Sequence, residues 1–304
     1  MNQNPPLPSL DALLPAEMAK KAENVGVTKA DLGPFRMFAL AVLAGAFIAM
    51  GAVFMTIVTT GATGVLSYGV TRLLGGLAFC LGLILVVIAG AELFTGNNLI
   101  IMAWAGGKVS TGKLLRNWAI VYLGNFAGSI LTAYGVFLSG QYLFNKGAVG
   151  LNALNIAAAK TNHDFIPALM LGIFCNALVC LAVWLCMGAR TTVDKIAAII
   201  FPISAFVAAG FEHSIANMYF IPIGLFIKSS APAEFWANIQ QTPADFASIT
   251  WGNFLVVNLL PVTLGNIIGG ALMVGLVYWF IYLRPSWTGR KSATEDQEAK
   301  VKNA

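Results

Sequence analysis

The fold is decided by two short, similar stretches, GAELFTGN at residues 90–97 and GFEHSIAN at residues 210–217. Glycine, glutamate and asparagine hold the same places in both, at a constant separation of 120 residues (from 90 to 210). Each stretch interrupts an apolar segment, 73–107 in the first case and 196–227 in the second. Such a segment is too long for one membrane helix of roughly 20 residues and too short for two with a turn. We therefore expect a helix broken inside the membrane at each stretch, because irregular backbone at that depth is tolerated only where protein buries it or it lines a cavity.

The composition of the whole chain is typical of a membrane protein. Of 304 residues, 58% are hydrophobic and 10% are charged, whereas about 25% are charged in a soluble domain. A water-soluble protein cannot cover that much apolar surface, which excludes a cytosolic enzyme, a nucleic-acid-binding protein and a disordered chain. Four further uncharged segments, 37–59, 117–145, 165–189 and 246–283, bring the number of membrane regions to six.

The distribution of basic residues predicts the orientation. With six spans and a cytoplasmic N-terminus, four of the 18 Lys and Arg residues lie on the outer side, namely Arg72, Lys146, Lys160 and Lys228. The others gather on the cytoplasmic side, as the positive-inside rule requires. We therefore expect a multi-pass protein of the cytoplasmic (inner) membrane with both termini in the cytoplasm, and we interpret the net charge of +5 as a sign of orientation.

Three parts are expected along the chain. Residues 1–34 form a cytoplasmic segment, residues 35–284 a membrane domain and residues 285–304 a polar tail, which we expect to be disordered because it is rich in mixed charges. Apolar residues recur at helical spacing over residues 8–24, at Leu10, Leu13, Leu14 and Met18. This pattern predicts a short amphipathic helix, acting either as a surface anchor or as a gate over a pore.

A second pair of similar stretches extends the repeat. LGNFAG at 123–128 matches LGNIIG at 264–269, so the first three spans (about 35–145) correspond to the last three (about 164–284). An odd number of spans in each half forces the halves into opposite orientations. The sequence therefore predicts an all-α membrane protein with six transmembrane helices in a 3+3 inverted repeat, whose broken second and fifth helices meet near the midplane.

Three ionisable side chains lie away from the membrane edges: Glu92, Glu212 and His213. Charge at that depth is costly and usually marks a pathway. Each glutamate could alternatively accept hydrogen bonds from the free N–H groups of its own broken helix, and His213 could be a satisfied core residue. The helix break favours a functional role for His213, because imidazole can donate a hydrogen bond or take up a proton near neutral pH. Thr95, in the matching break, is its candidate partner.

These stretches resemble the formate/nitrite transporter family, and the formate channel branch in particular. The resemblance runs from about residue 8 to residue 284. Its motifs are GFEHSIANM at 210–218, LLPVTLGNIIGG at 259–270, GGLAFCLGLILVV at 75–87 and CNALVCLAVW at 175–184. The resemblance implies an aquaporin-like fold, assembled as a homopentamer with one pore in each protomer.

The resemblance also implies roles for individual residues. His213 would be the central pore histidine and Thr95 its gating neighbour, and Asn266 would face the pore. Glu212 and Asn176 would form, with Lys160, an outer network that attracts the anion. The cytoplasmic-side constriction would consist of Phe79, Leu83 and Phe206, the periplasmic one of Leu93 and Val179, and the loop supports would be Glu92, Asn97 and Asn217.

Simpler interpretations of these residues remain open. Without the resemblance, Lys160 is a plain loop lysine, the constriction residues are ordinary packing residues, and the asparagines of the LGN motifs are interhelical hydrogen-bonding residues, an interpretation that we keep for Asn125. The loop from Thr95 to Asn98 reads Thr-Gly-Asn-Asn, and it departs from the hydroxylated residues usual in the formate branch. Its gating and selectivity therefore stay open.

The expected function is a channel that passes formate, as the anion or as formic acid. Lys160 and the helix dipoles would attract the anion, and His213 would hydrogen-bond or protonate it before it crosses an apolar ring. Nitrite or hydrosulfide is the alternative substrate within the family. A water or glycerol channel would show paired Asn-Pro-Ala motifs, which this chain lacks. We expect no metal site, because the four cysteines lie in apolar segments without metal-ligand spacing. We also expect no enzymatic activity, no cofactor and no nucleic-acid partner. The lipid bilayer is the other expected partner.

Overall fold

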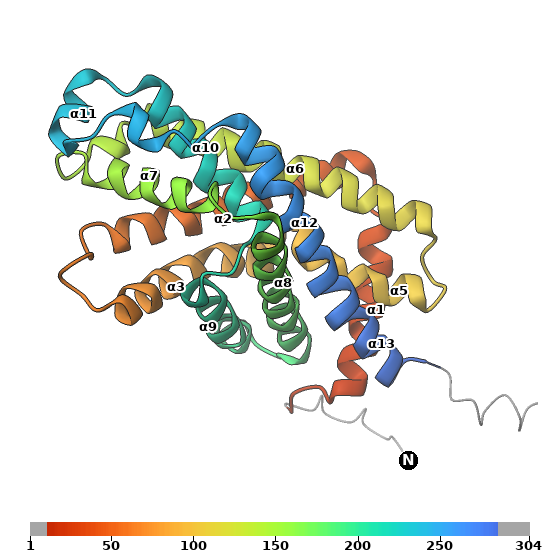
Figure 1. Ribbon diagram of the computed structural model, residues 1–304. Coiled ribbons are helices and arrows are strands. Elements are labelled where there is room, and N and C mark those ends of the chain that lie inside the picture. The colour runs from red at the N-terminus through yellow and green to blue at the C-terminus, as the bar shows by residue number, and fades with distance from the viewer. Residues whose placement is uncertain (1–10, 285–304) are drawn as a thin grey trace, which may run out of the picture.

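The computed structural model describes residues 11–284, which form a bundle of helices without strands (Figure 1). Six helices are long and apolar enough to cross a membrane, so the prediction of six is confirmed. In chain order the elements are α1 (Pro15–Ala30), α2 (Pro34–Thr59), α3 (Tyr68–Leu85) with η1 (Val86–Gly90), α4 (Phe94–Asn97), η2 (Asn98–Ile100), α5 (Ile101–Ala105), α6 (Thr111–Leu138), η3 (Gln141–Leu143), α7 (Ala148–Lys160), α8 (Phe165–Gly188), α9 (Thr192–Ala209), α10 (Ser214–Ser230), α11 (Ala233–Ile239), η4 (Pro243–Phe246), η5 (Asn253–Leu259), α12 (Leu260–Ile267), η6 (Ile268–Leu276) and α13 (Val277–Tyr282).

The long helices begin earlier than the uncharged segments predict. Arg36 lies in the first turn of α2, Arg72 in the second turn of α3, and Arg116 in the second turn of α6. A long basic side chain can bury its aliphatic part and place its charged end near a helix terminus. A charged residue in the sequence therefore does not show where a membrane helix begins. Arg72 also donates to the carbonyl oxygens of Val207 and Ala208 (3.1 Å to the latter), which caps the C-terminal end of α9.

Two of the long helices end at a glycine in the left-handed backbone region. Helix η1 ends at Gly90 (φ +82°), and Gly210 (φ +78°) follows α9. A side chain would be strained at such a φ, which favours glycine. After a few non-helical residues, new helices start at Phe94 and Ser214.

The helices pair in the same way in the two halves of the chain. In the first half α2 packs against α3 and α6, and in the second α8 packs against α9 and α12. Backbones approach closely at Gly128 and Gly269, where a Cβ atom would overlap the carbonyl oxygens of Val42 and Ile173. Small residues at these crossings permit the tight packing typical of membrane helices.

Helix α1 differs from the predicted amphipathic helix in position and environment. It begins at Pro15 and continues to Ala30, and it packs against α5, α8 and α13 through buried Met18, Ala19 and Ala22 (Figure 1). Of the predicted apolar face, Leu14 is exposed, and Leu10 lies outside the described residues. The predicted tail, 285–304, also lies outside them. Helices α1 and α11 lie at opposite ends of the molecule in Figure 1.

Candidate functional site

His213 is buried at the start of α10, where its imidazole ring caps the helix. The Ala216 backbone N–H donates to its Nδ1 atom over 3.1 Å. Because a backbone N–H can only donate, Nδ1 is an acceptor and the proton of the neutral ring lies on Nε2. This assignment follows from the hydrogen-bond geometry. His213 therefore presents a hydrogen-bond donor away from its own helix.

Thr95 meets this donor from the other interrupted segment. Its Oγ1 lies 3.1 Å from Nε2 of His213, so the structure brings the two residues together as the mirrored stretches predict. The Thr95 carbonyl oxygen accepts from Asn176 Nδ2 (3.2 Å) and from Cys180 Sγ (3.3 Å). Helix α8 thus holds the backbone that carries the threonine.

Glu212 is the centre of a buried charge cluster. Its Oε1 accepts from Lys160 Nζ at 2.9 Å, and its Oε2 accepts from Asn217 Nδ2 at 2.6 Å and from Asn258 Nδ2 at 3.2 Å. His163 Nε2 lies 3.7 Å from the same Oε1. An ionised carboxylate inside a protein needs such partners, because isolated burial costs several kcal/mol.

Glu92 has an equivalent set of partners near the other interruption. Its Oε1 accepts from Lys29 Nζ at 2.8 Å, and its Oε2 accepts from Asn97 Nδ2 at 2.7 Å. Asn97 also donates to Asn117 (2.9 Å), whose own amide donates to the Lys29 carbonyl oxygen (3.2 Å). The second cluster repeats this pattern, since Asn217 donates to Asn258 (2.7 Å) and Asn258 donates to the carbonyl oxygen of Lys160 (2.8 Å).

Two buried asparagines, Asn125 and Asn266, hold the interrupted backbone. Asn266 Oδ1 accepts from the Ser214 N–H (2.9 Å), and its Nδ2 donates to the carbonyl oxygens of Gly172 (2.8 Å) and Glu212 (3.0 Å). Asn125 makes the corresponding bonds to the Phe94 N–H (2.9 Å) and to the carbonyl oxygens of Ala41 (2.7 Å) and Glu92 (2.9 Å).

The interpretation that the glutamates accept from their own broken helices is therefore wrong. The Glu92 and Glu212 N–H groups donate to the carbonyl oxygens of Leu40 and Leu171, each over 3.2 Å. The first N–H of each following helix donates to an asparagine. The carboxylates of Glu92 and Glu212 therefore accept from lysine and asparagine side chains. The free N–H groups of the interrupted backbone donate to Asn125 and Asn266.

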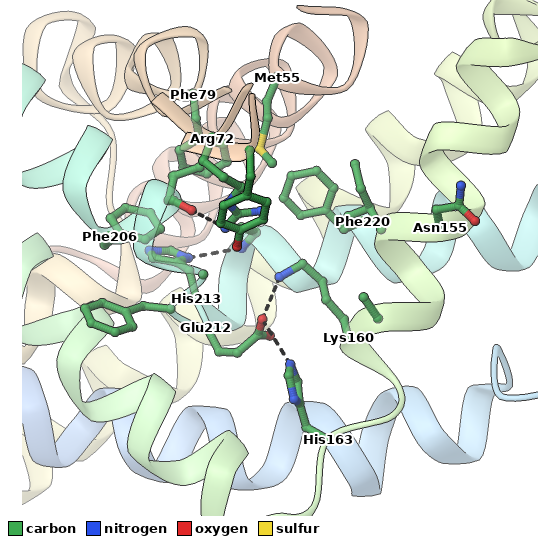
Figure 2. A pocket seen from close by; sticks show the side chains of 17 residues that line it. Met55, Arg72, Phe79, Asn155, Lys160, His163, Phe206, Glu212, His213 and Phe220 are labelled. Carbon is green, nitrogen blue, oxygen red and sulfur yellow. Dashed lines mark hydrogen bonds and ion pairs between the residues drawn. The ribbon is translucent and has the colours of Figure 1, made fainter. Parts of the chain in front are cut away.

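Two cavities approach this centre from different sides. The first, here called the Lys160 cavity, has a volume of about 370 Å³ and is lined by Lys160, His163, Arg72, Glu212 and His213 among others (Figure 2). The second, here called the α1 cavity, measures about 480 Å³. Its basic residues are Lys21, Lys29, Arg36 and Lys195, and Glu92 is its acidic residue.

The structure groups three of the predicted constriction residues with the cavities differently from what the resemblance implies. Phe79 and Phe206 line the Lys160 cavity, whereas Leu93 lines the α1 cavity with Lys29. The resemblance had placed the phenylalanines on the side away from Lys160 and Leu93 on the side of Lys160. Phe79 and Phe206 lie on α3 and α9, before the two interruptions, whereas Leu93 lies within the first interruption, directly before α4.

The other predicted site residues lie as follows. Leu83 lines the α1 cavity. Val179 is buried in the core and is not among the residues that line either cavity. Asn176 donates to the Asn266 carbonyl oxygen (2.7 Å) and to Thr95, rather than joining Lys160 among the hydrogen bonds of residues 11–284. It therefore supports Thr95 and the segment of Asn266 and does not join the Lys160–Glu212 cluster.

Sequence reasoning missed Lys29, Asn117, Asn258 and His163. Lys29 was counted only among the cytoplasmic basic residues, and His163 was given no role, although it lines the same cavity as His213. A signal was present for the asparagines, because Asn117 and Asn258 are separated by the same number of residues as Asn125 and Asn266. Among residues 11–284, no three His, Cys, Asp or Glu side chains are grouped closely enough to hold a metal ion.

Comparisons with known proteins agree with this architecture. A family model described as "Formate/nitrite transporter" matches residues 16–280. The formate channel FocA of Escherichia coli (strain K12) is 49% identical over 274 residues, which are 90% of this chain and 96% of FocA. FocA of Haemophilus influenzae is 44% identical over 265 residues, 87% of this chain and 93% of its own length.

Solved structures are similar over most of their length. One, described as a pentameric formate channel with formate bound, has a TM-score of 0.79 and 50% identity, and the match covers 83% of this chain and 98% of that one. Another, described as an FNT family ion channel, has a TM-score of 0.74 and 28% identity, with 88% and 99% covered.

Proposed function

The chain belongs to the formate/nitrite transporter family, and on that premise we propose that this membrane transporter passes formate through one pore in each protomer of a homopentamer. The names of its relatives and the formate in the pentameric neighbour support this substrate and assembly. The single observation that carries the proposal is the buried contact between His213 Nε2 and Thr95 Oγ1. It offers a hydrogen-bond donor and a hydroxyl to a small anion at the centre of the fold.

The proposed route starts in the Lys160 cavity. The Lys160 ammonium attracts the carboxylate, and the N–H of His213 then donates to it. Moving a bare carboxylate through an apolar ring costs several kcal/mol or more, and a hydrogen-bonded or protonated species crosses far more easily. Phe206, whose ring stacks 5.8 Å from the His213 ring, and Phe79 form the apolar ring on this side, and Leu83 and Leu93 form the one on the α1 side.

The same centre serves transport in the other direction. From the α1 cavity, Lys29 attracts the anion as Lys160 does from its own side. Glu92 and Glu212, with Asn97 and Asn217, are proposed to hold the interrupted segments in place. Val179 packs behind the centre, and Asn176 and Asn266 position Thr95 and the segment before α10.

We also propose the 3+3 inverted repeat and its boundaries in the membrane. The matching helix pairs and the two equivalent hydrogen-bond clusters support it. The lysine of each cluster comes from a short helix that precedes the first long helix, α1 before α2 and α7 before α8. The repeat unit therefore extends further toward the N-terminus than residues 35–145 and 164–284.

The proposed location is the cytoplasmic membrane, with both termini in the cytoplasm and the Lys160 cavity facing outward. The partners are the anion, the lipid bilayer and four further copies of the chain, and no nucleic acid. The mechanism needs hydrogen bonding and at most proton exchange, so we propose no enzymatic activity and no cofactor.

The test is uptake of isotope-labelled formate into proteoliposomes, with nitrite, hydrosulfide and glycerol measured in parallel. Fast formate uptake by the wild type and its loss in His213→Ala are expected. The control is Thr132→Ala, which removes a half-buried hydroxyl that donates to the carbonyl oxygen of Gly128 within α6 and should leave uptake unchanged.

Two results would change the proposal. Unaltered formate uptake in a folded His213→Ala variant would refute the central role of the histidine. Preference for nitrite or hydrosulfide would keep the pore but assign the alternative substrate, with the loop from Thr95 to Asn98 as the first segment to examine.

A further inference from the structure

The two lysine–glutamate clusters differ in how firmly each lysine is held. Lys29 Nζ donates to Glu92 Oε1 (2.8 Å) and also to Asn97 Oδ1 (3.0 Å). Lys160 Nζ donates to Glu212 Oε1 alone among the described residues, and Asn217 Oδ1 is buried without a hydrogen-bond partner there. Lys160 therefore retains more of its hydrogen-bonding capacity for a ligand than Lys29 does.

A histidine occupies the space around the looser pair. His163 lies three residues after Lys160, and the residue three positions after Lys29 is Leu32. His163 and Lys160 approach the Glu212 carboxylate from two sides (Figure 2). The distance from His163 Nε2 to Glu212 Oε1 is 3.7 Å, and the exposed fractions of the His163 and Glu212 side chains are 30% and 4%. Leu32 lines the α1 cavity, so the Lys160 cavity has a histidine beside its lysine–glutamate pair and the α1 cavity does not.

We propose that His163 makes anion capture in the Lys160 cavity sensitive to the pH on that side of the membrane. This inference rests on the proposed transport of formate. When His163 is neutral, the trio of His163, Lys160 and Glu212 carries no net charge. When a proton binds, His163 forms a charged pair with Glu212 Oε1, the hold of Glu212 on Lys160 weakens, and the trio carries one positive charge. A small anion then binds more tightly.

The other titratable and charged groups near this cavity are the same in the wild type and in the variants described below. Arg72 is engaged with the end of α9, and Tyr68 lines the rim from α3. His213 Nδ1 accepts from the Ala216 N–H. Asp164, the next residue after His163, is exposed. None of these residues changes in the variants below, so a difference between the wild type and a His163 variant reports His163.

The experiment is formate flux as a function of concentration in proteoliposomes with separately buffered sides. The side of the Lys160 cavity is set to about pH 8 and then about pH 5, the range in which histidine changes its charge. The variants are His163→Gln and His163→Leu, the latter copying Leu32. Because the share of formic acid in solution changes equally for all proteins, the ratio of wild type to variant isolates the residue.

We expect acidification of that side to lower the half-saturating formate concentration of the wild type roughly three- to tenfold relative to either variant, since one charge is added a few ångströms from the ligand. The ratio of maximum flux between the wild type and either variant should change little, and acidifying the α1 side should produce no difference in half-saturation between them. A wild-type-like shift in folded His163→Gln would overturn the inference. Absence of formate flux in the wild type would overturn the proposed function as well, whereas flux with the same half-saturation at both pH values would overturn this inference alone.

Discussion

Replacing Asn266 with alanine is expected to destabilise the protein by at least about 3 kcal/mol. The side chain is fully buried, and it makes three hydrogen bonds to backbone groups of two different segments. Alanine leaves all three groups, the Ser214 N–H and the carbonyls of Gly172 and Glu212, without this partner. A cavity of this size in an apolar interior also loses packing contacts.

The magnitude follows from the number of orphaned groups. Each buried polar group left unsatisfied costs about 1–3 kcal/mol, so three groups cost about 3–9 kcal/mol. We take the lower end because the Gly172 and Glu212 carbonyl oxygens each have a second lone pair that can accept another bond. A chain of this size loses roughly 2 °C of melting temperature per kcal/mol, which predicts a fall of roughly 6 °C or more.

The assay is thermal denaturation of the purified protein in detergent, followed by a spectroscopic signal of helix. The mirrored variant Asn125→Ala should fall by a similar amount, because it loses the corresponding three bonds. The control Asn155→Ala removes the same groups from an exposed position on α7 and should shift the melting temperature by less than about 2 °C. An Asn266→Ala protein that melts with the control would refute the reasoning.

Three further predictions follow from the same structure. In His213→Gln, the amide still donates a hydrogen bond but takes up no proton, so the pH dependence of maximum formate flux should disappear; an unchanged profile would exclude proton transfer by this residue. Lys160→Met leaves Glu212 buried without its cation and should cost about 3–5 kcal/mol, while the double variant Lys160→Met with Glu212→Gln should recover melting temperature but not anion capture, and recovery of both would contradict the role of the charge. Burial, followed by the charges of Lys195 and Arg190, lowers the pKa of Lys21 from its ordinary value of 10.5. As the pH approaches 10.5 from below, the unfolded state then binds more protons than the folded state, so stability should rise with pH up to that value. The melting temperature of wild type minus that of Lys21→Met should therefore increase as the pH is raised to 10.5, and a flat difference would count against the shift.

The sequence was informative about the long helices and the centre because both rest on local patterns. Uncharged segments of sufficient length predict spans, and the six helices are found. The mirrored stretches predicted that Thr95 and His213 would face each other, and their hydrogen bond is present in the structure. The two similar stretches therefore carried spatial information, since one residue of each meets the other at the centre of the fold.

Which cavity a side chain faces could not be predicted from the sequence in the same way. Phe206 shares a cavity with Lys160 and Leu93 shares one with Lys29, the opposite of what the resemblance implied, because the packing of the helices decides which cavity a side chain faces. Lys29 was missed because it lies outside the uncharged segments, on a helix whose approach to Glu92 depends on tertiary packing. His163 was missed for the same reason, since its position in a loop does not reveal that its side chain reaches Glu212.

The order of the chain has a consequence for how the protein is made. Lys29 precedes Glu92, and Lys160 precedes Glu212, so synthesis from the N-terminus delivers each cation before the carboxylate that it neutralises. An ionised carboxylate without a partner in hydrocarbon is costly. An ion pair with a lysine that has already been synthesised reduces this cost. Each half of the molecule can therefore neutralise its own buried acid while it leaves the ribosome, and the nascent first half need not wait for the second to be inserted.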